Sequence, residues 1–182
     1  MSQSKELVLL IKAHRRFNQI LRGMANKHSE IEVIDQLIDL IEELFPTRMG
    51  SLLLVDQQTQ TLHLSAAKTK LPPFYNQAID GLPLGADIGS CGAAAFLKKP
   101  YIVSDIQTHL NWQPFVEIAQ QAALGACWSM PVFSKQNIVL ATFAIYSPVF
   151  SEPSDYELEI LESAANIASI ALDKSHYLSI KK

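Results

Sequence analysis

Several features that mark common functional classes are scarce in this chain of 182 residues. Only two cysteines are present, Cys91 and Cys127, too few for a disulfide-stabilised scaffold. The formal net charge is −3 and no basic face is evident, which argues against nucleic-acid binding. No apolar run reaches the length of a bilayer span, so we expect no membrane insertion. The first residues lack signal-peptide features, so the expected compartment is the cytoplasm.

Motifs of common catalytic sites are missing as well. The five histidines are scattered, without an HExxH motif or a paired spacing. Neither a GxSxG motif nor a Walker loop occurs, and two cysteines without clustered histidines make a poor metal site. We therefore expect no catalytic and no metal-binding residues. The composition, with 48% hydrophobic and 18% charged residues, is typical of an ordinary globular domain.

Hydrophobic spacing predicts helices at both ends of the chain and a sheet between them. Apolar residues three and four apart predict an amphipathic helix over residues 5–24 and a last helix from residue 155 to about 177. Ser29 and Glu32 form a capping-box pattern at the start of a second helix. Strands are predicted over residues 49–56, 61–67, 82–84, 101–103, 126–133 and 138–147. This order predicts an α+β domain with the terminal helices on one face of the sheet.

Residues 85–131 are the best candidate for a small-molecule pocket. Three glycines surround Ser90, which is a good N-cap for a short helix. Free N–H groups at that helix N-terminus favour an anionic group of a ligand, although a tight turn with an ordinary cap explains the same residues. A polar loop and the aromatic residues Trp112 and Phe115 follow. A helix end, a polar loop and aromatic side chains commonly line pockets.

Six segments of the chain together match the pattern of one domain family. They are IGSCG, KPYIVSDI, ACWSMPV, LATFAIY, SEPSDYELEILE and the hairpin GSLLLVDQQTQTLHLSAA. With these segments, roughly residues 30–174 resemble a GAF domain, in particular the bacterial branch found with diguanylate cyclases and sensor histidine kinases. The resemblance implies a central antiparallel sheet of about six strands, with helices on one face and a ligand pocket on the other. It also implies regulation and not catalysis.

The resemblance divides the chain into an N-terminal signalling or dimerisation helix, residues 1–28, and a GAF domain, residues 29–182. The pocket residues that it implies are Ser90, Cys91, Asp105, Trp112, Phe115, Trp128 and Ser129. Each has a structural explanation too, because free cysteines are usually small hydrophobes, aspartates often tie loops, and aromatic side chains are more often core. The ligand, and any cofactor, stays unidentified.

We expect a sensory module that binds a small molecule and acts through its terminal helices on an effector. The apolar stripes on those helices predict a homodimer held by a helical bundle, unless both stripes pack on their own sheet. The chain ends without an output domain, so it is either a fragment of a signalling protein or a stand-alone GAF protein. Two alternatives remain: an enzyme like the free methionine sulfoxide reductases, using Cys91 and Cys127, or a pure dimerisation module.

Overall fold

The computed structural model describes residues 3–65 and 67–180, and its centre is a six-stranded antiparallel sheet. The strand order across the sheet is β3-β2-β1-β6-β5-β4. The strands are β1 (Met49–Asp56), β2 (Thr61–Leu64), β3 (Leu82–Pro83), β4 (Tyr101–Val103), β5 (Ala126–Phe133) and β6 (Val139–Ser147). The long strands β5, β6 and β1 lie in the middle, and the short strands β3 and β4 form the edges.

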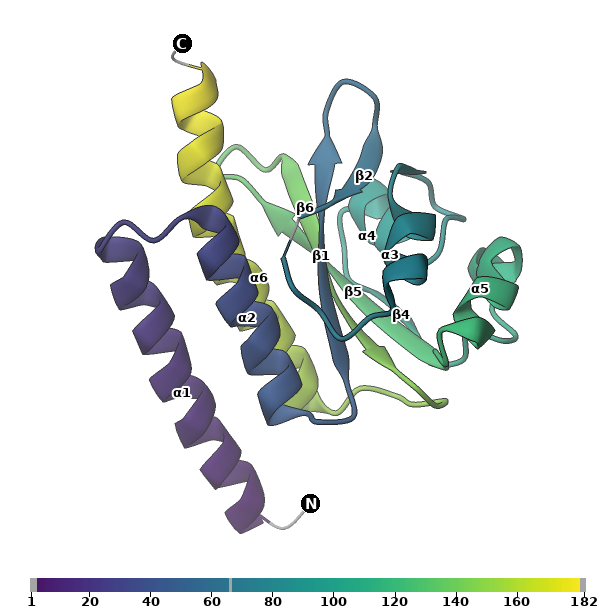
Figure 1. The fold of residues 1–182 in the computed structure, drawn as a ribbon, viewed down its shortest axis with the longest axis horizontal. Helices are drawn as coiled ribbons and strands as arrows, with labels where there is room; N and C mark the ends of the chain where they lie inside the picture. Colours follow the sequence, from purple (N-terminus) through teal and green to yellow (C-terminus); the bar gives the residue numbers. More distant parts are fainter. Residues whose placement is uncertain (1–2, 66, 181–182) are drawn as a thin grey trace.

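Helices cover both faces of this sheet (Figure 1). One face carries the long helices α1 (Gln3–Ala25), α2 (Glu30–Leu44) and α6 (Asp155–Ile180). The other carries the short elements α3 (Pro73–Ile79), α4 (Cys91–Leu97), the 3₁₀-helix η1 (Leu110–Phe115) and α5 (Val116–Gln121). This architecture confirms the predicted α+β fold with a six-stranded antiparallel sheet and the terminal helices on one face.

Local sequence explains where the two core helices begin. Ser29 accepts the Glu32 N–H at 3.3 Å while the Glu32 carboxylate accepts the Ser29 N–H at 2.7 Å, which confirms the predicted capping box of α2. Ser154 and Glu157 make the same exchange at the start of α6, with N–H donors 3.2 Å and 2.9 Å from their acceptors. Each capping box thereby satisfies one N–H of the first helical turn and the N–H of the cap residue.

The register of the middle strands decides which side chains meet which helices. Cys127 of β5 pairs with Tyr146 of β6, and both belong to the hydrophobic cluster beneath the short helices. Trp128, the next residue of β5, belongs to the opposite cluster with α2 and α6. Because successive side chains of a strand point to opposite faces, a shift by one residue would exchange these two sets.

Some predicted boundaries shift by a few residues. The strand expected over residues 61–67 ends at Leu64, whose N–H donates to the Asp80 carboxylate at 2.9 Å instead of to a strand partner. The strand expected over residues 82–84 keeps only Leu82–Pro83. Both differences concern the edge of the sheet, where pairing depends on neighbours distant in sequence.

Candidate functional site

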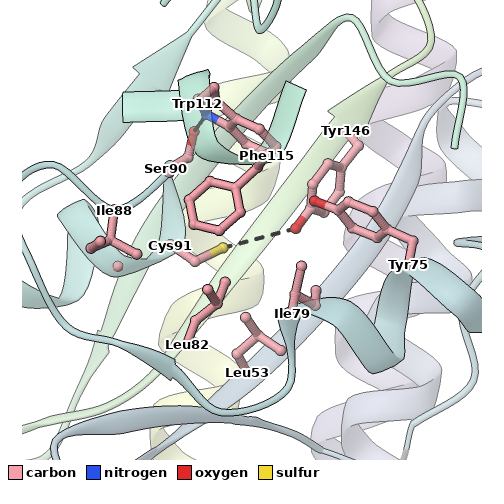
Figure 2. Close-up of a pocket in the computed structure, with 12 residues that line it drawn as sticks. Leu53, Tyr75, Ile79, Leu82, Ile88, Ser90, Cys91, Trp112, Phe115 and Tyr146 are labelled. Atoms are coloured by element: carbon pink, nitrogen blue, oxygen red, sulfur yellow. Dashed lines mark hydrogen bonds between the residues drawn. The ribbon is translucent and has the colours of Figure 1, made fainter. Parts of the chain in front are cut away.

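A small cavity lies between the sheet and the layer that contains α3, α4 and η1 (Figure 2). Its volume is about 20 Å³, which is room for about one water molecule. The lining residues are Leu53, Tyr75, Ile79, Leu82, Ile88, Gly89, Ser90, Cys91, Gly92, Trp112, Phe115 and Tyr146. No charged side chain is among these described residues, so the cavity is neutral, mostly apolar and edged by hydroxyl and thiol groups.

Ser90 lines the cavity. Its side chain was predicted to cap α4, but it does not do so. Its backbone is already helical, with φ −92° and ψ −42°, and its side chain makes no capping hydrogen bond. Ser90 Oγ instead donates to the Cys127 carbonyl at 3.1 Å and accepts the Trp112 indole N–H at 3.1 Å. The Ala93 N–H, which was expected to face an anion, donates to the Ile88 carbonyl at 3.1 Å. The Ser90 side chain therefore connects β5 of the sheet to η1.

Cys91 places its thiol in the cavity wall, 4.0 Å from the Tyr146 hydroxyl oxygen. Hydrogen bonding with the Cys127 thiol is the main cause that lowers the pKa of Cys91 to about 7. Burial raises the pKa of Cys127 well above its ordinary value. The two thiols thus differ in character: Cys91 gives up its proton readily, and Cys127 keeps its own.

Three buried hydroxyls on the same face of the sheet have no hydrogen-bond partner among the described residues. They belong to Ser51, Ser129 and Thr142. Ser51 and Ser129 flank Ala144 from the neighbouring strands, and Thr142 lies two residues from Ala144 along β6. An unpaired buried hydroxyl costs free energy, and most such groups in folded proteins find a partner. The predicted residue Ser129 therefore lies near the cavity, in a polar patch beneath α4, but not in the cavity wall.

Trp112 and Phe115 both line the cavity, as the resemblance implied. Their rings meet edge to face with centroids 6.4 Å apart. Trp112 is held by its hydrogen bond to Ser90, whereas Phe115 reaches the cavity from the last position of η1. These two side chains form the aromatic end of the cavity.

Asp105 and Trp128 lie outside the cavity, which corrects their predicted place. The Asp105 carboxylate accepts the Gln107 N–H at 3.0 Å and the Thr108 hydroxyl at 2.8 Å, so it shapes its own loop. Trp128 is fully buried on the helix side of the sheet. The strand that contains it was predicted, but the face that it occupies follows from the register with β6.

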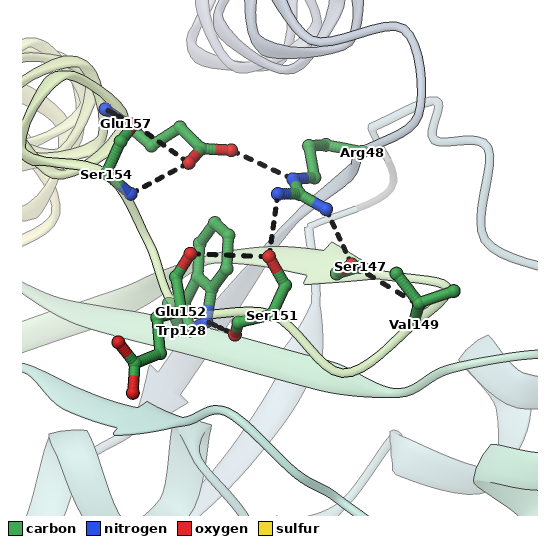
Figure 3. A network of polar contacts seen from close by, with 8 residues as sticks. All are labelled: Arg48, Trp128, Ser147, Val149, Ser151, Glu152, Ser154 and Glu157. Atoms are coloured by element: carbon green, nitrogen blue, oxygen red, sulfur yellow. Dashed lines mark hydrogen bonds and ion pairs between the residues drawn. The ribbon is translucent and has the colours of Figure 1, made fainter.

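Trp128 belongs to a polar cluster around Arg48 (Figure 3). The Arg48 guanidinium lies 4.9 Å from the centroid of the Trp128 ring and donates to the Glu157 carboxylate at 2.9 Å. It also donates to the hydroxyls of Ser147 at 2.6 Å and Ser151 at 3.0 Å. The start of β1, the end of β6 and the first turn of α6 are thus joined at one half-buried cation. We call these five residues the Arg48 cluster.

A family model for the GAF domain matches residues 27–173, most of the chain. The chain belongs to the GAF domain family.

Relatives with names and solved structures are consistent with this assignment. The chain is 33% identical over 172 residues to the methyl sulfide methyltransferase-associated sensor of Methanosarcina acetivorans, covering 94% of this chain but 17% of that protein. Among solved structures, free methionine-R-sulfoxide reductase of Neisseria meningitidis has a TM-score of 0.73 and 19% identity, with 91% of each chain covered. The GAF domain of a phosphoenolpyruvate-protein phosphotransferase of Coxiella burnetii has a TM-score of 0.72 and 16% identity, with 92% and 98% covered. At these identities the structures show the shared GAF fold alone.

Two important cavity residues of this GAF domain were not predicted from the sequence. Tyr75 and Tyr146 are both buried, with ring centroids 5.8 Å apart, and burial raises the pKa of each well above its ordinary value. They are therefore neutral hydroxyl groups at the cavity. The apolar strand LATFAIY ends in Tyr146, and a polar-tipped residue within such a strand was a usable indication. Tyr75 lies in the short helix α3, whose sequence offered none.

The described ranges, residues 3–65 and 67–180, contain neither a cluster of metal-ligand side chains nor a membrane-spanning helix. No three histidine, cysteine, aspartate or glutamate side chains there come together as metal ligands would. No helix in those ranges combines the length and the apolar character needed to cross a bilayer.

Proposed function

We propose that this GAF domain is a sensory module that binds a small, uncharged molecule on the cavity face and passes its state to helix α6. The sensor named among its relatives supports the sensory role. The neutral lining supports an uncharged ligand, because an unpaired charge in such a site would lose its hydration without gaining a partner. The hydroxyls of Tyr75 and Tyr146 supply polar contacts that fix its orientation.

Binding of anything larger than water requires the cavity to expand. Helix α3 is the element best suited to move, since Tyr75 and Ile79 are its only buried side chains among the described residues and both line the cavity. A ligand that takes their place in the cavity would displace α3 outward. Such a ligand selects an open form over the closed one, which is the differential affinity that a sensor needs.

The pleat of β5 and β6 offers a route from the cavity face to α6, and this observation carries the proposal. Cys127 and Tyr146 lie on the cavity face, while the residues that follow them, Trp128 and Ser147, belong to the Arg48 cluster. That cluster ends on Glu157 in the first turn of α6. A ligand that shifts Tyr146 therefore displaces a strand whose other face holds the start of the helix.

A matched pair of probes tests the ligand class. Benzyl alcohol and benzoate have similar shape but differ in charge, and we expect only the neutral alcohol to raise the melting temperature. Leu82→Phe fills the cavity and should abolish this shift, whereas Leu110→Phe changes a leucine that is 83% exposed and should retain it. Native mass spectrometry of the protein as purified identifies a retained ligand. Equal shifts of the melting temperature with both probes, or no shift with either, would contradict the proposal of a site for neutral ligands. The remaining explanation would then be a pure dimerisation module.

Hydrogen exchange tests the coupling to α6. Benzyl alcohol should change the exchange of amides in the first turns of α6, and Arg48→Lys, which replaces the forked guanidinium by a single ammonium, should weaken that change. Lys12→Arg, at an exposed ion pair with Glu43, serves as the matched control. A change in α6 that persists unaltered in Arg48→Lys would remove the Arg48 cluster from the route.

We further propose that two copies associate through α1, one of the two terminal helices that were predicted to form the dimer. The outer side of this helix exposes Leu7, Val8 and Ile11, which are 58%, 64% and 45% exposed, while Ala13 and Ile20 pack inward. Ile11→Glu should convert a dimer to a monomer in size-exclusion chromatography with light scattering. Val149→Glu, which changes an exposed residue of the β6–α6 connection, should not. A monomer in the unaltered protein would end this proposal.

One observation favours a second candidate, an enzyme that reduces free methionine sulfoxide. Cys91 lies in the cavity wall with Cys127 beside it, so a bound sulfoxide could meet a thiolate. Turnover of free methionine sulfoxide with a thiol reductant, abolished in Cys91→Ser, would establish this activity. Without turnover the sensory proposal stands alone.

A further inference from the structure

The only two thiols of the chain belong to one buried cluster on the cavity face of the sheet, although they are 36 positions apart in sequence. Ser90 Oγ donates to the Cys127 carbonyl at 3.1 Å, which ties the first turn of α4 to β5. Cys91 Sγ lies 4.0 Å from the Tyr146 hydroxyl, and Tyr146 is the partner of Cys127 in the ladder between β5 and β6. Hydrogen bonding between the two thiols is the largest cause that lowers the pKa of Cys91.

The surroundings of Cys91 suit a thiolate better than a thiol. The hydroxyls of Ser129 and Thr142 are fully buried without partners, so their O–H groups are free to turn toward a negative sulfur. The titratable groups that face Cys91 are Cys127, Tyr146 and Tyr75, and no charged side chain is among the described residues that line the cavity. Apolar burial alone raises the pKa of a thiol, so the lowered pKa of Cys91 reports hydrogen bonding with Cys127 first and, to a smaller extent, with the neighbouring hydroxyls.

The cavity limits the size of the molecules that can reach the Cys91 thiol. Its volume of about 20 Å³ holds about one water molecule, and Cys91 forms part of its wall. A hydroperoxide of minimal size can reach the sulfur with little displacement of the lining. Bulky thiol reagents cannot do so while the protein is folded. The cavity thereby selects small oxidants.

We propose that Cys91 and Cys127 form a peroxide-reactive dithiol, in which Cys91 is oxidised first and Cys127 closes an intramolecular disulfide. The Cys91 thiolate attacks one oxygen of hydrogen peroxide, the O–O bond breaks, and the departing hydroxide takes the proton that Cys91 released, forming water and a Cys91 sulfenic acid. The Cys127 sulfur then attacks the Cys91 sulfur and the S–O bond breaks. The thiol proton of Cys127 leaves with that hydroxide as a second water. Peroxide gains the two electrons that the dithiol loses.

Mass spectrometry of the intact chain tests this directly. Hydrogen peroxide should lower the mass of the unaltered protein by two hydrogens and remove both titratable thiols, and dithiothreitol should restore them. Non-reducing electrophoresis should show a monomeric chain, because both thiols are buried. Retention of both thiols, or a disulfide between chains, would overturn the proposal.

Two variants assign the order of the steps. Cys127→Ala should accumulate a Cys91 sulfenic acid that dimedone traps once the oxidised protein is unfolded, whereas Cys91→Ala should leave Cys127 unmodified. Dimedone adducts on Cys127 would reverse the assignment and contradict it. The mass change in the unaltered protein is independent of the folding of either variant, and it does not require the small-molecule site proposed above to bind anything.

The pH dependence of the oxidation rate tests whether the thiolate of Cys91 is the reactive form. The oxidation rate should rise through pH 7, following the lowered pKa of Cys91. Thr142→Val removes one thiolate donor, and if it raises this pKa by one unit the rate at about pH 6 falls about tenfold. Thr59→Val, on an exposed turn, is the matched control and should not change the rate. Equal oxidation rates in the unaltered protein, Thr142→Val and Thr59→Val would show that the buried hydroxyls do not stabilise the thiolate.

Discussion

The two faces of the sheet differ in how their buried polar groups are paired. On the helix face, Phe143 and Ile145 are fully buried against α2 and α6, and the half-buried Arg48 donates to a carboxylate and two hydroxyls. On the cavity face, neighbouring positions hold Thr142 and Ser129, whose hydroxyls lack partners. The Arg48 cluster on the helix face thus pairs its polar groups, whereas the cavity face keeps unpaired hydroxyls whose cost the proposed functional role would explain.

The largest effect should come from truncating the helix face. Phe143→Ala removes a fully buried ring and leaves a cavity between the sheet and the long helices. We expect a loss of about 3–5 kcal/mol in the free energy of unfolding. Urea unfolding measures it. A loss below about 1 kcal/mol would mean that this face is loosely packed and that the contrast between the faces does not hold.

A second, somewhat smaller loss should follow from breaking the Arg48 cluster. Arg48→Ala leaves the Glu157 carboxylate buried without its cation, at side-chain exposures of 14% and 10% in the native pair. Removing one partner of a buried pair costs about 3 kcal/mol or more. Lys12→Ala breaks the exposed pair with Glu43 and should cost less than about 1 kcal/mol in the same urea experiment. Similar losses in both variants would show that burial of the cluster contributes nothing.

The smallest effect, with the opposite sign, should come from the cavity face. Thr142→Val replaces a buried, unpaired hydroxyl by a methyl group of similar shape, one residue from Phe143. Such a replacement is nearly neutral or stabilising, by up to about 1 kcal/mol. Thermal and urea unfolding of the variant provide the measurement. Clear destabilisation would indicate that the hydroxyl has a partner, and the functional explanation of the unpaired hydroxyls would lose its basis.

Most elements of this fold could be predicted from local patterns. The helical spacing of the terminal segments and the capping boxes at Ser29 and Ser154 identify helices whose structure depends on their own sequence. The candidate site was predicted in part: Cys91, Trp112 and Phe115 line the cavity, because the segment that carries them is continuous. Tyr75 was missed, since it enters the cavity from a short helix without strong periodicity.

The residues of β5 show why the rest could not be predicted. Cys127 and Trp128 are adjacent and both apolar, so no alternation distinguishes the buried face from the other. Trp128 was assigned to the pocket on the resemblance, but its ring lies beneath Arg48 on the far side of the sheet. Only pairing with β6 settles which of the two side chains faces α4.

By itself, the sequence determined the helices, the strands and their order, because these follow from spacing, capping and turn residues that act within a few positions. The tertiary structure alone decided that Cys91 meets Cys127, that three hydroxyls lie unpaired beneath α4, and that Arg48 joins β6 to α6. These juxtapositions depend on strand register and on the packing of distant segments, for which no local pattern of residues carries information.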